Sequence, residues 1–299
     1  MNDIQLYNLI PMDSPQDVLD EAIVILDLIS PDFDTAPVTS AFNMVVNLFS
    51  GKYPGYRACN TEYHDLRHTI DTFLAMVRLI HVAVLDDETF TNHHITLGLI
   101  AALLHDAGYI QEEHDTDGTG SKHAANHVRR SMDFLERHGS ELGLSYDEIT
   151  AGRAIILCTD LAVDISTIVF TSDKVELLGK MLGSADILAQ MADRIYLEKL
   201  LFLYYEFKEA GVGDYLGEVD LLRKTVAFYD FISQRLKTTL DETDRFMGPH
   251  FTSRWGIHAN LYHVAITKQK NYLKQILKNQ NSDPRDHLRR GGIVDKLRR

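Results

Sequence analysis

The sequence predicts an all-α protein, a multi-helix bundle, and three observations lead to this prediction. None of the seven prolines lies between Gly55 and Gly248, so long helices are permitted over that stretch. Apolar residues recur at three- and four-residue steps along much of the chain. Strand patterns are weak, and the best candidate is the very short segment 167–170.

The first helices are predicted from start signals and from apolar spacing. Ser14, Pro15 and Asp17 supply an N-cap, a proline at the first helical position and an acid in the first turn, so a helix should run to about residue 26. Gly108 is expected to end a later, more apolar helix in a left-handed conformation. The further helices predicted in this half are 39–50, 62–84 and 91–106.

The second half is predicted to be helical as well. Ser145 and Glu148 form a capping box before an apolar run. Ser172 opens a helical stretch that reaches residue 210, with a break expected near Gly183. A glycine-rich loop should follow, and then a helix over 221–240.

Length and composition favour one helical domain over residues 1–278, followed by a polar to basic tail, 279–299, expected to be frayed or loosely docked. Thirty Lys and Arg against 43 Asp and Glu give a net charge of −13, which disfavours duplex nucleic acid as a partner. The sequence shows no signal peptide and no stretch near the roughly 18 apolar residues of a membrane span. Cys59 and Cys158 lack disulfide or zinc-finger spacing. We therefore expect a cytoplasmic protein without a membrane partner, and a homo-oligomer stays open.

Three motifs carry side chains suited to chemistry. His64 and His68 are four residues apart and, if helical, would share one face. His105 and Asp106 end an apolar helix, where buried charge needs compensation that a cation would supply. Asp186 lies among small and apolar residues, where a lone carboxylate is costly. Each motif alone also fits an ordinary surface or helix-end role.

Taken together, these motifs supply two histidines and two carboxylates that could hold one metal ion. Two imidazoles and two carboxylates suit Zn²⁺, iron, Mn²⁺ or Ni²⁺ better than the all-oxygen shell that Ca²⁺ prefers.

The order of these motifs resembles the HD-domain superfamily of metal-dependent phosphohydrolases, over roughly residues 53–236. The closest likeness is to the catalytic domain of the class I cyclic nucleotide phosphodiesterases. That family's Tyr-His-Asn-x-x-His pattern is matched by residues 63–68, with Asp65 in place of Asn. Its later His-Asp, Thr-Asp and Ala-Asp pairs fall on residues 105–106, 159–160 and 185–186.

The resemblance implies roles for the matched residues. His68, His105, Asp106 and Asp186 would bind the first metal ion. Asp106 would bridge the first ion to a second one, Mg²⁺ or Mn²⁺, and His64 would protonate the leaving oxygen. Thr159 and Asp160 would orient water at the second ion or support His64. Tyr63, beside His64 in the motif, is expected to contact the substrate.

The chain departs from the family pattern in two places. Tyr109 stands where the phosphodiesterases place another histidine, and Thr225 falls near their purine-binding glutamine, which leaves Phe228 as an aromatic clamp without an amide. Cyclic nucleotide specificity is therefore not expected. His123 and His127, expected on one helix, are candidates for holding an anion or for supporting the second ion.

The leading functional hypothesis is hydrolysis of a small anionic phosphoester by a metal-bound hydroxide, with His64 as general acid. Two alternatives remain open. Some HD proteins are di-iron oxygenases, and a helical module of this kind can also bind a metal or ligand without catalysis.

Overall fold

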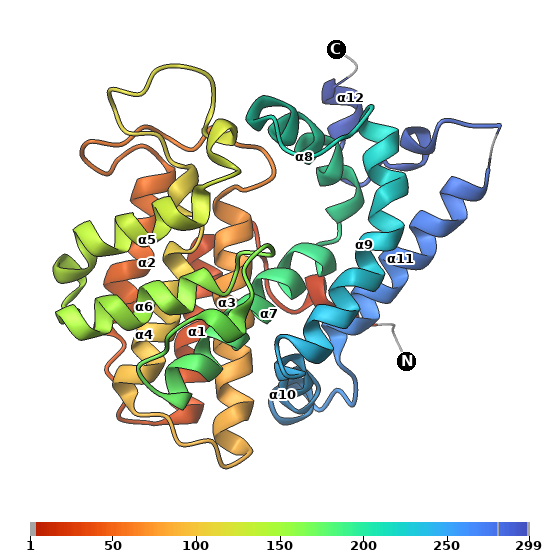
Figure 1. The fold of residues 1–299 in the computed structure, drawn as a ribbon. Coiled ribbons are helices and arrows are strands. Elements are labelled where there is room, and N and C mark those ends of the chain that lie inside the picture. The colour runs from red at the N-terminus through yellow and green to blue at the C-terminus, as the bar shows by residue number, and fades with distance from the viewer. Residues whose placement is uncertain (1–3, 280, 298–299) are drawn as a thin grey trace.

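The fold is all-α. The computed structural model describes residues 4–279 and 281–297, which form twelve α-helices and, between them, short 3-10 helices (Figure 1). Within these residues no strand forms, and a single isolated β-bridge pairs Tyr56 with Glu112. The α-helices are α1 (Pro15–Ile29), α2 (Ala36–Phe49), α3 (Leu66–Leu85), α4 (Asn92–Leu104), α5 (His127–His138), α6 (Tyr146–Leu157), α7 (Asp173–Ala192), α8 (Tyr196–Ala210), α9 (Glu218–Thr238), α10 (Met247–Trp255), α11 (Leu261–Lys278) and α12 (Ile293–Leu297).

Two hydrophobic cores organise these helices. The first lies among α1–α7 and α10 and reaches the start of α11, and the second lies among α8, α9, α11 and α12 and includes Ile187 and Met191 of α7. Figure 1 shows α1–α6 on one side of the molecule and α8, α9, α11 and α12 on the other, with α7 between them. α3 packs against α7 at the centre, so helices from distant parts of the chain meet there.

α3 is long and apolar enough to cross a membrane by length and composition alone, but 83% of its apolar window is buried inside the protein. Burial of this kind is typical of the core helix of a soluble protein.

Several predicted start signals are confirmed. Ser14 Oγ accepts a hydrogen bond from the Asp17 backbone N–H, and Ser172 caps α7 in the same way. Ser145 and Glu148 form the reciprocal capping box at the start of α6.

Four local predictions are wrong. Segment 167–170 ends a 3-10 helix and forms no strand. The break expected near Gly183 falls instead between α7 and α8, after Ala192. His123 lies in a 3-10 helix and His127 opens α5, so they do not share one helix. Gly108 has no positive φ; a Cβ there would stand 2.0 Å from the His127 carbonyl oxygen, so close packing of backbones requires this glycine.

The tail is docked rather than frayed over residues 281–297. Leu288, Ile293 and Val294 are buried, and α12 packs against α8. The buried Glu198 carboxylate of α8 accepts hydrogen bonds from the backbone N–H groups of Arg290 and Gly291. Arg298 and Arg299, part of the basic tail, lie outside the described residues.

Replacing Glu198 by Ala should therefore release the tail, because buried N–H groups would lose their acceptor at a cost of about 1–3 kcal/mol. We expect faster hydrogen exchange and faster tryptic cleavage at residues 285–290. Glu209→Ala is the matched control, since Glu209 lies on the same helix but bonds Thr119. Equal exchange in both variants would contradict this account of docking.

A buried histidine pair joins α3 to α10. His81 Nδ1 and His250 Nδ1 are 3.1 Å apart, and both side chains are almost fully buried. Burial, with Arg254 nearby, lowers the pKa of His81; burial, followed by Arg78, lowers the pKa of His250 to about 2. The folded protein thus resists a proton that the unfolded chain accepts.

Stability should consequently fall as the pH drops below about 6.5, by up to about 1.4 kcal/mol per pH unit for each such histidine. His250→Leu should flatten this slope between pH 6.5 and 4.5 in urea unfolding. His93→Leu is the control, because His93 is exposed and should leave the slope unchanged. An unchanged slope in His250→Leu would refute the assignment.

Candidate metal centre

The first metal-site histidine is fixed by the start of α3. Asp65 is the N-cap of this helix, and its Oδ1 accepts a 2.8 Å hydrogen bond from the His68 backbone N–H. His68 therefore stands in the first turn of α3, with its side chain buried. His64 precedes the helix, so the prediction that His64 and His68 share a helical face is wrong. The chain bends before Asp65, and the centroids of the two rings still lie only 6.0 Å apart.

The second pair stands where α4 ends. This helix is apolar and largely buried, and His105 is its C-cap, with Asp106 directly after it. Both side chains are about 1% exposed. The carbonyl oxygen of Ala102 lies 2.8 Å from His105 Nδ1 and can only accept, so Nδ1 carries a hydrogen and Nε2 faces Asp106.

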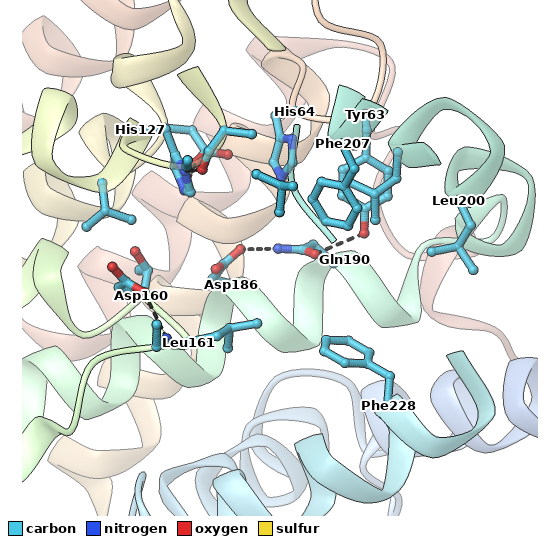
Figure 2. A pocket seen from close by; sticks show the side chains of 18 of the residues that line it. Tyr63, His64, His127, Asp160, Leu161, Asp186, Gln190, Leu200, Phe207 and Phe228 are labelled. Atoms are coloured by element: carbon cyan, nitrogen blue, oxygen red, sulfur yellow. Dashed lines mark hydrogen bonds and ion pairs between the residues drawn. The ribbon is translucent and has the colours of Figure 1, made fainter. Parts of the chain in front are cut away.

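Asp186 comes from the middle of α7. The small residues before it let α7 approach its neighbours closely; a Cβ on Gly183 would stand 2.8 Å from the Cys158 carbonyl oxygen. Gln190, one turn later, donates a 2.6 Å hydrogen bond to Asp186 Oδ1 and accepts one from the Tyr63 hydroxyl. Figure 2 shows this chain from Asp186 through Gln190 to Tyr63.

The four predicted ligands converge. His68 Nε2 lies 3.3 Å from Asp106 Oδ2 and 3.1 Å from Asp186 Oδ1. His105 Nε2 lies 3.4 Å from Asp106 Oδ2, 3.7 Å from Asp186 Oδ1 and 3.4 Å from His68 Nε2. Ligands about 2.0–2.2 Å from one ion are separated by roughly 3–3.6 Å, so these spacings fit a shared cation. The tightest set is His68, His105 and Asp106; Asp186 joins it through both histidines.

An unpartnered atom supports the same interpretation. Asp106 Oδ2 is buried and has no hydrogen-bond partner among the residues that the structure describes, although it faces both histidines. A buried carboxylate oxygen without a donor is costly, and a metal ion would compensate it. The donor set therefore fits a divalent ion such as Zn²⁺, iron or Mn²⁺.

The charges in the cluster also favour a bound cation. Burial alone would lower the pKa of His68, but the neighbouring carboxylates of Asp106 and Asp186 outweigh burial and raise that pKa to about 10. Burial likewise opposes ionisation of Asp106, yet His105 and His68 hold its pKa well below the usual value. The ionised carboxylates thus demand positive charge, which comes either from protons on the histidines or from a metal that displaces them.

A carboxylate that sequence reasoning missed orients His64. Glu206, buried on α8, places Oε2 2.7 Å from His64 Nδ1, and its Oε1 accepts the backbone N–H groups of Glu62 and Tyr63. The hydrogen of His64 is therefore held on Nδ1, which leaves Nε2 as the nitrogen with no carboxylate partner. No sequence pattern links α8 to the loop before α3. The signal that the sequence does offer is an acidic residue, Glu206, in a helix rich in apolar residues.

Tyr109 and His127 stand beside His64. The Tyr109 ring stacks on His64 at 4.3 Å and on His127 at 4.5 Å, and the two imidazoles are themselves 6.0 Å apart, so the three rings pack together. His127 Nδ1 donates to the Ala124 carbonyl at 2.8 Å, and its Nε2 lies 3.7 Å from Asp106 Oδ1. Asp106 therefore faces His68 and His105 with Oδ2, and it faces His127 with Oδ1.

A cavity of about 820 Å³ opens beside the centre. Figure 2 shows His64, His127, Asp160 and Asp186 around it, with Phe207 and Phe228 farther from Asp160. Of the other predicted site residues, Tyr63, Tyr109, Asp106 and Thr159 also line it. The Thr159 hydroxyl donates to the Ile156 carbonyl, and Asp160 Oδ1 accepts from the Ala162 N–H.

His123 is not brought to this cavity. Its Nε2 lies 3.2 Å from Asp115 Oδ2, and the other oxygen of the same carboxylate accepts a hydrogen bond from Lys122. His123 is absent from the residues that line the cavity. The structure therefore does not support the predicted contact of His123 with substrate, because Asp115 holds the ring elsewhere.

Compared with models of known protein families and with curated proteins, the chain matches none. The assignment of function accordingly depends on the site itself.

Proposed function

We propose that this protein is a metal-dependent phosphohydrolase of the HD-domain kind. The observation that supports it most is the convergence of His68, His105, Asp106 and Asp186, with one buried carboxylate oxygen that has no hydrogen-bond donor within the described part of the chain. A bound divalent ion would supply a hydroxide at neutral pH and neutralise phosphate oxygens. A cavity beside this cluster gives a substrate access to it.

His64 is the proposed general acid. It lines the cavity, and the Glu206 carboxylate beside Nδ1 would stabilise the charged ring in which both nitrogens carry a hydrogen. From that ring Nε2, which lies 3.5 Å from the Tyr109 hydroxyl, would donate its proton to the departing ester oxygen. Tyr109, stacked on the ring, limits its rotation. A binding module without catalysis would have no need of a buried carboxylate that fixes this histidine.

The residues also accommodate a second ion, Mg²⁺ or Mn²⁺. Asp106 Oδ1 and His127 Nε2 would be its protein ligands, with Asp160 and Thr159 close by on the cavity wall. Tyr109 replaces the histidine expected there and offers a phenol, which is a weaker ligand. We propose a small anionic phosphoester as substrate and the cytoplasm as the place of action.

The test is metal analysis combined with a substrate screen. Protein purified without chelators should hold at least one transition-metal ion per chain, and it should hydrolyse phosphomonoesters or phosphodiesters when Mn²⁺ is present. Iron with an O₂-consuming activity would favour the di-iron oxygenase instead. Metal without any turnover would favour a non-catalytic metal-binding module, and protein without metal would overturn the proposal.

A further inference from the structure

The cavity beside the metal centre has two chemically different ends. Its polar end is formed by the acidic residues and histidines of the centre. Its far end lies between α8 and α9 and is apolar, and the side chains that form it are Leu200, Leu203, Phe207, Leu221, Phe228 and Phe231. A substrate whose phosphate reaches the metal centre would place its organic group against this apolar end.

Two polar groups at the apolar end are already paired. The Thr225 hydroxyl donates to the Leu221 carbonyl at 2.9 Å. The Lys224 ammonium donates to the Asp214 carbonyl and pairs with Asp220 at 3.0 Å. Tyr196 and Tyr215 also line the cavity, and each offers a single hydroxyl. A nucleobase presents adjacent donors and acceptors, which would lose water here and meet these separate hydroxyls rather than a side chain that supplies a donor and an acceptor together.

The amide side chains of the cavity do not change this conclusion. Within the described residues, two amides line it, Gln190 and Asn126. Gln190 uses its nitrogen for Asp186 and its oxygen for Tyr63. Asn126 is exposed at the start of α5, and it belongs to neither α8 nor α9, the helices that form the apolar end.

We propose that the substrate is a phosphoester with a large apolar organic group, aryl or long alkyl, rather than a nucleoside. This inference rests on the proposed function. In the reaction, the oxygen of one water molecule bonds to phosphorus, the P–O bond to the organic group breaks, and the alcohol leaves with one proton. The apolar end gains its binding energy from removing the alkyl or aryl surface from water.

Binding of non-hydrolysable ligands tests the inference without requiring turnover. Titration calorimetry of the full chain in Mn²⁺ would compare methylphosphonate, octylphosphonate and adenosine monophosphate. Each buried methylene is worth about fourfold in affinity, so octylphosphonate should bind at least about a hundredfold more tightly than methylphosphonate. It should also bind more tightly than the nucleotide. Equal affinity for the two phosphonates, or a preference for the nucleotide, would overturn the inference.

The variant Phe228→Asn tests whether the octyl chain binds at the apolar end of the cavity. Phe228 is half-buried on the cavity wall, so its replacement should spare the fold and reduce the preference for the octyl chain by at least about tenfold. Phe202→Asn is the matched control, because Phe202 is also half-buried, lies on α8 and does not line the cavity. An octyl preference that survives Phe228→Asn unchanged would contradict the proposed location.

This design separates two failures. If turnover is absent but the octyl preference is present and sensitive to Phe228, then the proposed hydrolysis is wrong and the apolar ligand class stands. If short-chain phosphoesters are hydrolysed without any preference for chain length, then the hydrolase stands and the apolar substrate class is wrong.

Discussion

Replacing His68 by Ala is expected to abolish both metal binding and turnover. His68 Nε2 lies within 3.3 Å of both Asp106 and Asp186, so its loss removes one ligand and leaves these two neighbouring carboxylates without the imidazole that pairs with both. Loss of a direct ligand should exceed the about 10- to 100-fold drop in metal affinity that follows loss of a supporting residue. Competition with a chromophoric chelator would measure the affinity, and turnover should fall to the metal-free background.

Two controls accompany this variant. His114→Ala replaces an exposed histidine and should retain metal and activity. His68→Gln keeps the volume of the side chain, and circular dichroism of both His68 variants would show whether the helices form. A folded His68→Ala that binds metal as tightly as the wild type would refute the proposed ligand set.

Replacing Glu206 by Gln should slow turnover by about 10- to 100-fold with poor leaving groups while metal content stays normal. Because Glu206 Oε1 accepts two backbone N–H groups, the glutamine oxygen should stay there and its NH₂ should face His64 Nδ1. The hydrogen of His64 would then move to Nε2 and the ring would stay neutral, which makes it a weak acid. Replacing His64 by Asn should cost about 10²–10⁴-fold.

The leaving group separates this role from a structural one. A nitrophenolate departs with little help, so both variants should hydrolyse nitrophenyl esters much closer to the wild-type rate than alkyl esters. Glu209→Gln, on the same helix, is the control and should behave as wild type with both substrates. An equal loss with both leaving groups would contradict acid catalysis by His64.

The sequence was sufficient to predict the helical bundle and to single out four side chains that the fold brings together, because both depend on local patterns. α6 begins at a capping box, and Asp106 and Asp186 stand out as carboxylates in apolar surroundings that only a partner or an ion can compensate. Asp65 is a residue type favoured at helix N-caps, and an N-cap at this position predicts that His64 lies outside the helix.

The remaining features depend on contacts between distant segments, which the sequence does not encode locally. Glu206 contacts His64 although 142 residues separate them in the chain, and no sequence pattern around either residue predicts this contact. The tail was expected to be loose because its composition is basic, yet Glu198 supplies acceptors that no local pattern reveals. Gly108 was assigned to a helix stop, whereas the nearby His127 backbone is what requires a glycine there.

The most direct test of the account is a crystal structure of protein grown with Mn²⁺ or Zn²⁺, measured at wavelengths above and below the absorption edge of the metal. We predict an anomalous peak about 2.0–2.3 Å from His68 Nε2, His105 Nε2 and one carboxylate oxygen each of Asp106 and Asp186. Occupancy of that position by water, with the metal bound elsewhere on the surface, would contradict the proposed centre and with it the hydrolase.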